Sequence, residues 1–373
     1  MPRLMKSSQV KRNVGLELNA LLASKAISPA EFDKTRIRSA GTIVYDVNGE
    51  PLFRRVPIYK GRNRVAYADY AINPKIGGPL LAVSHGIDWN GREIREQAAA
   101  AARRARIRSF DRMRFVAYSY PKIAIQYLKG DTEVAMLEFG SWAKVPSQEQ
   151  RDREPLYPAQ FERWSLIDEL PTRQKSANAR AVEKRLAVWE EGVAPRGRLR
   201  ESPLRISLAT FDLERIVVQL SDTRELHYST RADDHVPCYE LRGQETNVWC
   251  VAASMQMFLD FWRYEYTQTR LAQALGLGTP SNPNGLPYSQ VGAVVTQIEA
   301  LTSNALDATM VTNPSWTVFR TEIRNNRPLI SFVPGHSRTV AGYTQSYITL
   351  ADKVPFRGLL VYDPWPPNAG VIT

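Results

Sequence analysis

The sequence is poor in cysteine, since its 373 residues include only Cys238 and Cys250. Two cysteines cannot build a disulfide framework, so packing must stabilise the fold. Long apolar runs are also missing, because no stretch reaches the roughly 20 apolar residues that a membrane-spanning helix needs. The basic start Met1–Arg12 is followed by residues too polar for a signal peptide core, so no export signal is visible and the localisation stays open.

The net charge of +11 lies entirely in the first two thirds of the chain. From Tyr239 to Thr373 there are nine Lys or Arg and nine Asp or Glu, which leaves 40 of the 49 basic and 29 of the 38 acidic residues before Tyr239. Such an asymmetry favours two parts with different surfaces and raises the hypothesis of a nucleic-acid-binding N-terminal domain. No zinc-finger spacing, RNP-like block or aromatic-interleaved basic stripe accompanies the charge, so we prefer a solvated surface.

Residues 1–230 are predicted to form a β-rich N-terminal domain of α+β character. Two runs of β-forming residues with turn residues between them predict hairpins near 41–53 and 123–139. The run Arg92–Arg108 predicts a helix with a solvated basic face. The polar stretch 146–200 is predicted to be a connector with one helix near Ser176–Glu191.

Residues 236–373 are predicted to form a separate α+β domain. The run Asn247–Tyr264 is apolar on nearly every face of a helix, which indicates a buried helix. Helices followed by strands in one unit are typical of α+β folds. Further helices are expected at 269–275, 289–302 and 315–325, and strands at 329–333, 338–343 and 359–363.

Cys250 is the first candidate for chemistry, because it lies in the first turn of the expected buried helix. Exposed backbone N–H groups and the positive end of the helix dipole lower a thiol pKa there and favour the thiolate. A buried structural cysteine is the plainer interpretation. Gln244 precedes Cys250 by six residues, and its side-chain amide could form an oxyanion hole with the Cys250 N–H.

His336 and Asp363 supply the other groups that a cysteine nucleophile needs. His336 is the only histidine in 236–373 and opens an expected strand, whereas Asp363 ends another. If these strands pair in antiparallel register, the two side chains lie nearly opposite each other. The carboxylate would then hold the imidazole in the tautomer required of a base. His235 and Cys238 could be half of a zinc site, but no second pair accompanies them, so no metal or cofactor is expected.

Four sequence blocks resemble the papain-like cysteine peptidases in their compact bacterial form, such as the bacteriocin-processing (double-glycine leader) peptidases. The ending Asp363–Pro367 is also similar to that of effector proteases from plant-pathogenic bacteria. The resemblance covers roughly 236–367 and departs from papain itself, whose nucleophile lies in a Cys-Gly-Ser-Cys-Trp block. Many members also have Asn in place of the last acid. The blocks are Gln244-x5-Cys250, Trp249–Ser254, Gly335-His336-x5-Gly342-Tyr343 and Val361–Pro364.

The resemblance implies a papain-like domain with a helical half and an antiparallel sheet half. It implies Cys250 as nucleophile, His336 as general base, Asp363 as orienting residue and Gln244 as oxyanion donor. The expected activity is that of a cysteine endopeptidase that acts on a protein or peptide through a thioester, without metal or cofactor. Transglutaminases and arylamine acetyltransferases share the Cys–His–Asp order, but the position of Gln244 favours the peptidase.

The N-terminal domain invites two interpretations. Residues 1–230 could be a regulatory or pro-domain that contacts and covers the protease cleft until the chain is cut within Thr230–Asp234. A fixed companion domain without an inhibitory role is the alternative.

Overall fold

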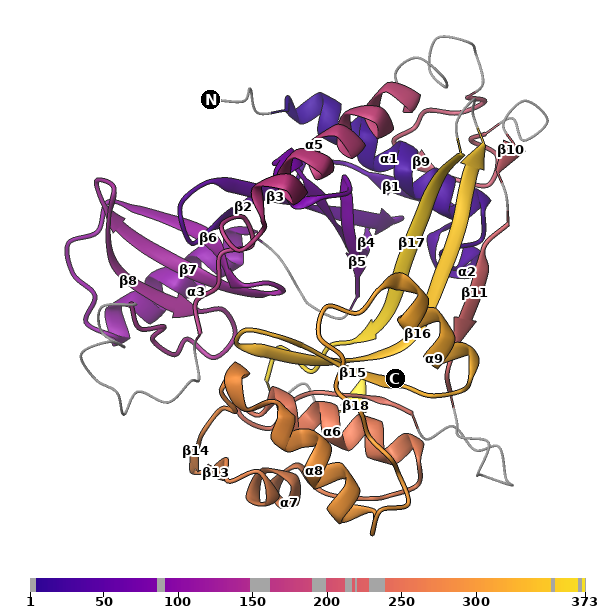
Figure 1. Ribbon diagram of the computed structural model, residues 1–373. Coiled ribbons are helices and arrows are strands. Elements are labelled where there is room, and N and C mark those ends of the chain that lie inside the picture. The colour runs from indigo at the N-terminus through magenta and orange to yellow at the C-terminus, as the bar shows by residue number, and fades with distance from the viewer. Residues whose placement is uncertain are drawn as a thin grey trace.

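The computed structural model shows a β-rich N-terminal part and a smaller group of helices that lies beneath a second sheet (Figure 1). Within the described residues, no helix combines the length and the apolar character needed to cross a membrane. The described residues are 5–85, 91–147, 162–189, 199–211, 217–218, 220–227, 239–349, 353–367 and 371–372.

The N-terminal part is organised by a nine-stranded sheet, in which seven strands follow the order β5-β4-β3-β2-β6-β7-β8. Its pairings are antiparallel except for the parallel pair β2 and β6. β1 pairs with both β3 and β9. The strands are β1 (Thr35–Ile37), β2 (Thr42–Asp46), β3 (Pro51–Lys60), β4 (Asn63–Ala71), β5 (Leu80–Ser84), β6 (Arg112–Ser119), β7 (Lys122–Lys129), β8 (Thr132–Glu138) and β9 (Arg205–Ile206).

Helices pack on this sheet and form two hydrophobic cores with it. α1 (Ser7–Ala23) packs with residues of β3 and β4 in one core, while the alanine-rich inner face of α3 (Gly91–Arg104) packs with β6 and β7 in the other. α5 (Thr172–Ala187) is fixed to α1 by a buried ion pair, in which Arg185 Nη2 lies 2.7 Å from Glu17 Oε2. The short helices α2 (Pro29–Phe32) and η1 (Pro74–Ile76) complete this part.

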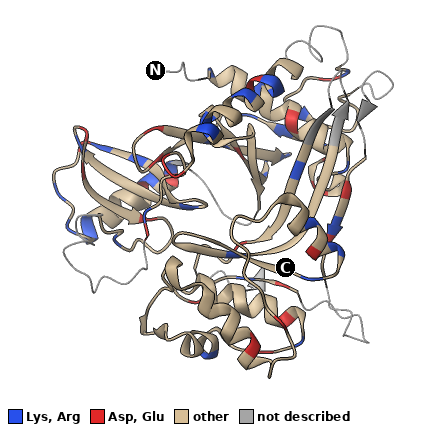
Figure 2. Cartoon of the chain, viewed as in Figure 1, with Lys and Arg blue, Asp and Glu red and all other residues tan. Residues whose placement is uncertain are grey.

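The charged side chains of the N-terminal part follow the expected pattern. α3 keeps its arginines on the exposed side, as the helix prediction for Arg92–Arg108 required. In Figure 2, Lys and Arg are seen on several N-terminal elements and on the long C-terminal hairpin.

The C-terminal part combines helices with a second, fully antiparallel sheet. In that sheet β16 is the central strand, and it pairs with β10, β11, β15 and β17. Two-stranded pairs are formed by β12 with β18 and by β13 with β14. The helices are α6 (Cys250–Phe261), α7 (Gln268–Ala274), η4 (Tyr288–Gln290), α8 (Gly292–Leu301) and α9 (Trp316–Arg324). The strands are β10 (Val217–Val218), β11 (Asp222–Glu225), β12 (Leu241–Arg242), β13 (Gly278–Thr279), β14 (Asn282–Pro283), β15 (Leu329–Val333), β16 (His336–Thr349), β17 (Lys353–Tyr362) and β18 (Val371–Ile372).

The mixed architecture agrees with the α+β class predicted from the sequence. The structure adds α1, which the sequence did not predict, and β16 continues to Thr349 although its expected strand ended at residue 343. The second half of β16 is held as a strand by β17 on one side and by β10 and β11, from far earlier in the chain, on the other. The proposed cleavage segment Thr230–Asp234 and Cys238 lie outside the described residues.

Replacement of Gly15 by alanine should destabilise the N-terminal part. Alanine favours helices by roughly 1 kcal/mol over glycine, but a Cβ at Gly15 of α1 would lie 1.9 Å from the Pro203 carbonyl oxygen. We expect a net loss of about 1–3 kcal/mol in the free energy of unfolding, measured by urea denaturation. Gly292→Ala, where a Cβ meets no atom within 4 Å, is the matched control. Equal urea midpoints for Gly15→Ala and the parent would contradict the packing argument.

Candidate active site

Cys250 is the first residue of α6, as its predicted place at a helix start required. The preceding Trp249 is fully buried and its indole N–H donates to the Leu277 carbonyl at 3.1 Å, which fixes the start of the helix. The first turn of a helix has backbone N–H groups without intrahelical partners. The Cys250 thiol therefore lies at a positive helix end, with its residue only 8% exposed.

His336 and Asp363 come from adjacent antiparallel strands. His336 opens β16 and is 3% exposed, while Asp363 directly follows β17. The strands pair with Thr339 opposite Tyr362, a register that brings the two site residues together. His336 Nε2 lies 2.8 Å from Asp363 Oδ1, and the same oxygen accepts the Trp365 backbone N–H at 3.0 Å.

The three groups shift one another's proton affinities. Burial raises the pKa of the Cys250 thiol, but the adjacent His336 imidazole, the Lys122 charge and the Ser337 N–H outweigh burial and hold the pKa below its ordinary value. Burial lowers the pKa of His336, yet Asp363 and Cys250 raise it above the ordinary value. Burial likewise opposes the charge on Asp363, whose pKa the imidazole nevertheless lowers. These shifts all favour a thiolate, an imidazolium and a carboxylate.

The ring of His336 has one nitrogen available for the cysteine. Nε2 is engaged by Asp363, whereas Nδ1 is buried and completes no hydrogen bond within the described residues. An imidazole held in this way by a carboxylate can exchange a proton at its second nitrogen. The arrangement can therefore transfer a proton between the Cys250 thiol and the group that it attacks.

Gln244 is brought to the same region, but its side chain is partly engaged elsewhere. It is fully buried, and its backbone N–H donates to the Pro364 carbonyl at 2.9 Å, next to Asp363. Its side-chain nitrogen donates to the Thr246 carbonyl at 2.7 Å. A primary amide has two N–H donors, so this bond uses one of the two, and Gln244 is not among the residues that line the pocket beside Cys250.

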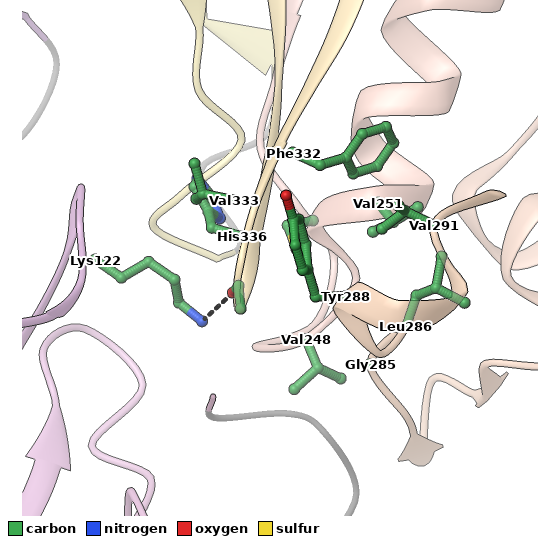
Figure 3. Close-up of a pocket in the computed structure, with 12 residues that line it drawn as sticks. Lys122, Val248, Val251, Gly285, Leu286, Tyr288, Val291, Phe332, Val333 and His336 are labelled. Atoms are coloured by element: carbon green, nitrogen blue, oxygen red, sulfur yellow. Dashed lines mark hydrogen bonds between the residues drawn. The ribbon is translucent and has the colours of Figure 1, made fainter. Parts of the chain in front are cut away.

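Cys250 and His336 line one narrow pocket (Figure 3). Its space is about 20 Å³, close to what a single water molecule requires. Most of the surrounding side chains are apolar, so the pocket favours an apolar group. The lining residues besides these two are Lys122, Val248, Val251, Gly285, Leu286, Tyr288, Val291, Phe332, Val333 and Gly335.

Two residues of this region were not among the candidate site residues of the sequence. Lys122 belongs to β7 of the N-terminal sheet, and its ammonium group donates to the Gly335 carbonyl at 3.4 Å (Figure 3). Trp365 lies in the ending that resembles effector proteases, and its side chain is buried in the core that α3 and β7 form. A lysine at the start of an apolar strand fits no site motif, and only the tertiary contacts reveal the places of both side chains.

Residues 235–372 match the model of the Peptidase_C39 like family. The C-terminal part is thus similar to cysteine peptidases of that family, which supports the papain-like prediction at the level of a cysteine-peptidase-type domain. No curated protein and no solved structure matches the chain. Within the described residues, no group of three or more His, Cys, Asp and Glu side chains could hold a metal ion.

The pH profile of Cys250 alkylation tests the electrostatics of the site. In a Cys238→Ser background, iodoacetamide should react with Cys250 at pH values below those of an ordinary thiol, whose pKa is about 8.5. Asp363→Asn removes the charge that supports the imidazolium, so the apparent thiol pKa should rise. The rate constants are measured by mass spectrometry of the Cys250 peptide. A profile unchanged by Asp363→Asn would contradict the coupling of the three groups.

Proposed function

We propose that this chain is a cysteine endopeptidase with Cys250 as its nucleophile. One observation supports the proposal above all others. The Cys250 thiol, at a helix start, shares a pocket with His336, and His336 Nε2 lies 2.8 Å from the Asp363 carboxylate. A nucleophile, a base and a group that orients the base form the arrangement that nucleophilic catalysis requires. The match of residues 235–372 to a peptidase family supports the same conclusion.

The reaction proceeds through a covalent acyl-enzyme. The Cys250 thiolate attacks the carbonyl carbon of a peptide bond, and His336 gives its proton to the departing amine as the C–N bond breaks. The resulting thioester is attacked by water, whose proton returns to His336, and the C–S bond then breaks to release the acid and restore the thiolate. Asp363 keeps its hydrogen bond to the imidazole throughout.

The oxyanion of the tetrahedral intermediate is assigned to two donors. One is the backbone N–H of Cys250 at the start of α6, and the other is the second side-chain N–H of Gln244. Donors already fixed by the fold stabilise the developing charge without reorganisation. The bond from Gln244 to Thr246 restricts rotation of the amide.

Labelling with an epoxide inhibitor of thiol peptidases tests the nucleophile. After limited proteolysis to activate both proteins, the inhibitor should modify the parent protein at Cys250, and Cys250→Ala should show neither labelling at residue 250 nor hydrolysis of a fluorogenic casein. Because Cys238 is also a thiol, the modified residue is identified by peptide mapping. Equal labelling of the parent and Cys250→Ala would refute the assignment.

Substitution of Gln244 tests the oxyanion donor. Gln244→Ala should lower kcat by about 100-fold with little change in KM, since the lost bond forms only in the transition state. Gln273, an exposed residue of α7, is the matched control, and Gln273→Ala should leave both constants unchanged. Similar kcat values for the two variants would remove Gln244 from the mechanism.

We also propose that the peptidase is latent until its N-terminal part is displaced or cut. The residue Cys250 is only 8% exposed, and its pocket is lined in part by Lys122 of the N-terminal sheet. The turn that carries His336 is bonded to the N-terminal part, because Ser119 Oγ donates to the Pro334 carbonyl at 2.5 Å and Glu162 Oε2 accepts the Gly335 N–H at 2.7 Å. Movement of the N-terminal part would therefore free one wall of the pocket.

Latency is tested by the N-terminal sequence of the active species. If activation requires a cut, protein recovered with a bound epoxide inhibitor should contain a chain that begins near residues 230–234 beside one that begins at Met1, while unlabelled protein should contain the Met1 chain alone. Full activity and full labelling of an intact chain, without any activating treatment, would overturn the proposal of latency. That outcome would leave the assignment of Cys250 untouched.

A further inference from the structure

Lys122 is a buried cation at the boundary between the N-terminal sheet and the candidate active site. It is 1% exposed, although lysine is among the residues that proteins bury least. Its ammonium group lies 3.3 Å from Glu138 Oε1 and 5.2 Å from the centre of the Tyr118 ring. A charge removed from water in this way needs compensation from its surroundings.

The surroundings of Lys122 hold its side chain in a fixed place. Glu138, which is fully buried, also accepts hydrogen bonds from Tyr118 and Ser141, each at 2.5 Å. The donors on Glu138 stabilise its negative charge, and that charge in turn stabilises the ammonium group. The lysine is therefore a fixed cation that also contacts the Gly335 carbonyl, one residue before His336.

Lys122 and Cys250 line the same pocket. Figure 3 shows Lys122 reaching from β7 toward the turn before His336, and the pocket that it lines includes Cys250. The charged groups gathered here are His336 and Asp363 from the C-terminal part, Lys122 and Glu138 from the N-terminal sheet, and Glu162 on the Gly335 N–H. The positive charge of Lys122 lowers the pKa of the Cys250 thiol, and the charge of Cys250 in turn raises that of Tyr118.

We propose that Lys122 is a positioning residue for the Cys250 thiolate, so that the N-terminal part of the chain completes the peptidase site as well as covering it. The inference rests on the proposed peptidase function and deepens it. An ammonium group at this place favours the ionised nucleophile through space and steadies, through Gly335, the turn that carries His336. This ammonium group belongs to β7, which lies more than 120 residues before Cys250 in the sequence.

The chain before residue 230 is bound to the C-terminal part by contacts that would survive a cut at 230–234. β10 and β11, which precede that segment, pair with β16. Trp365, which follows Asp363, lies in the N-terminal core against Phe139, with ring centres 5.9 Å apart. After cleavage, Lys122 would remain at the site by these noncovalent contacts.

The experiment measures the thiol of the full-length protein, without reference to turnover. In a Cys238→Ser background, the rate of Cys250 alkylation is followed between pH 4 and pH 10 with neutral iodoacetamide and with anionic iodoacetate. Lys122→Met keeps the apolar stem and removes the charge. We expect the thiol pKa to rise by about one unit, which slows alkylation about tenfold at acid pH, and the relative reactivity of iodoacetate to fall.

Control variants separate charge from structure. Lys122→Arg should retain most of the low thiol pKa, and Lys129→Met, at the exposed far end of β7, should change nothing. Because Lys122→Met leaves Glu138 without its cation, the double variant Lys122→Met/Glu138→Gln removes both charges and guards against misfolding. It should also raise the thiol pKa, with an unchanged far-ultraviolet circular dichroism spectrum.

The outcomes distinguish this inference from the peptidase proposal. If the charge-removing variants leave the pH profile and the preference for iodoacetate unchanged while Cys250 still reacts with the epoxide inhibitor, the role of Lys122 is overturned and the peptidase stands. If Cys250→Ala is labelled as well as the parent, the peptidase assignment itself fails. A raised thiol pKa in both charge-removing variants, restored by Lys122→Arg, supports the inference.

Discussion

The turn at Pro334 and Gly335 is the constraint on which both parts of the molecule depend. Gly335 has a φ of 76°, and a Cβ on it would lie 2.9 Å from the Glu162 carbonyl oxygen and 3.0 Å from Ser119 Oγ. Only glycine tolerates both the conformation and the close approach. The turn therefore points His336 into the site on one side and accepts the N-terminal part on the other.

The same region shows why the two parts share a core. Asp363 orients His336, and Trp365, two residues later, gives its backbone N–H to that carboxylate and its ring to the N-terminal core. A single short segment thus carries the hydrogen bond to His336 and an anchoring contact. Packing of the indole against Phe139 stabilises the position of the carboxylate, because the backbone between them is only two residues long.

Local patterns allowed much of the C-terminal part to be predicted. The all-round apolar run from Asn247 predicted the buried helix α6, with Cys250 at its start, because burial of such a run is dictated by the residues themselves. The pairing of β16 with β17 followed from two β-forming runs close in sequence. His336 and Asp363 came together for the same reason, since adjacent antiparallel strands need little information beyond their order.

Contacts between distant segments could not be predicted in this way. The polar strand β11 is exposed along its length, and it is a strand only because β16 supplies hydrogen-bonding partners. Lys122 looks like an ordinary solvated lysine until the fold buries it beside Glu138. The effect of its charge on the Cys250 thiol depends on the contact between the two parts, which exists only after both have folded. No spacing rule within one segment predicts that contact.

The bond from Lys122 to the Gly335 carbonyl links access to the thiol with ionisation of the thiol, two properties that peptidases can control separately. The space next to the thiol and the charge state of the thiol both depend on where β7 lies. A shift of that strand away from the turn would widen the entrance and reduce the fraction of ionised sulfur in the same movement. Access and reactivity would then vary in opposite directions, so the rate would be highest at an intermediate opening rather than after complete separation.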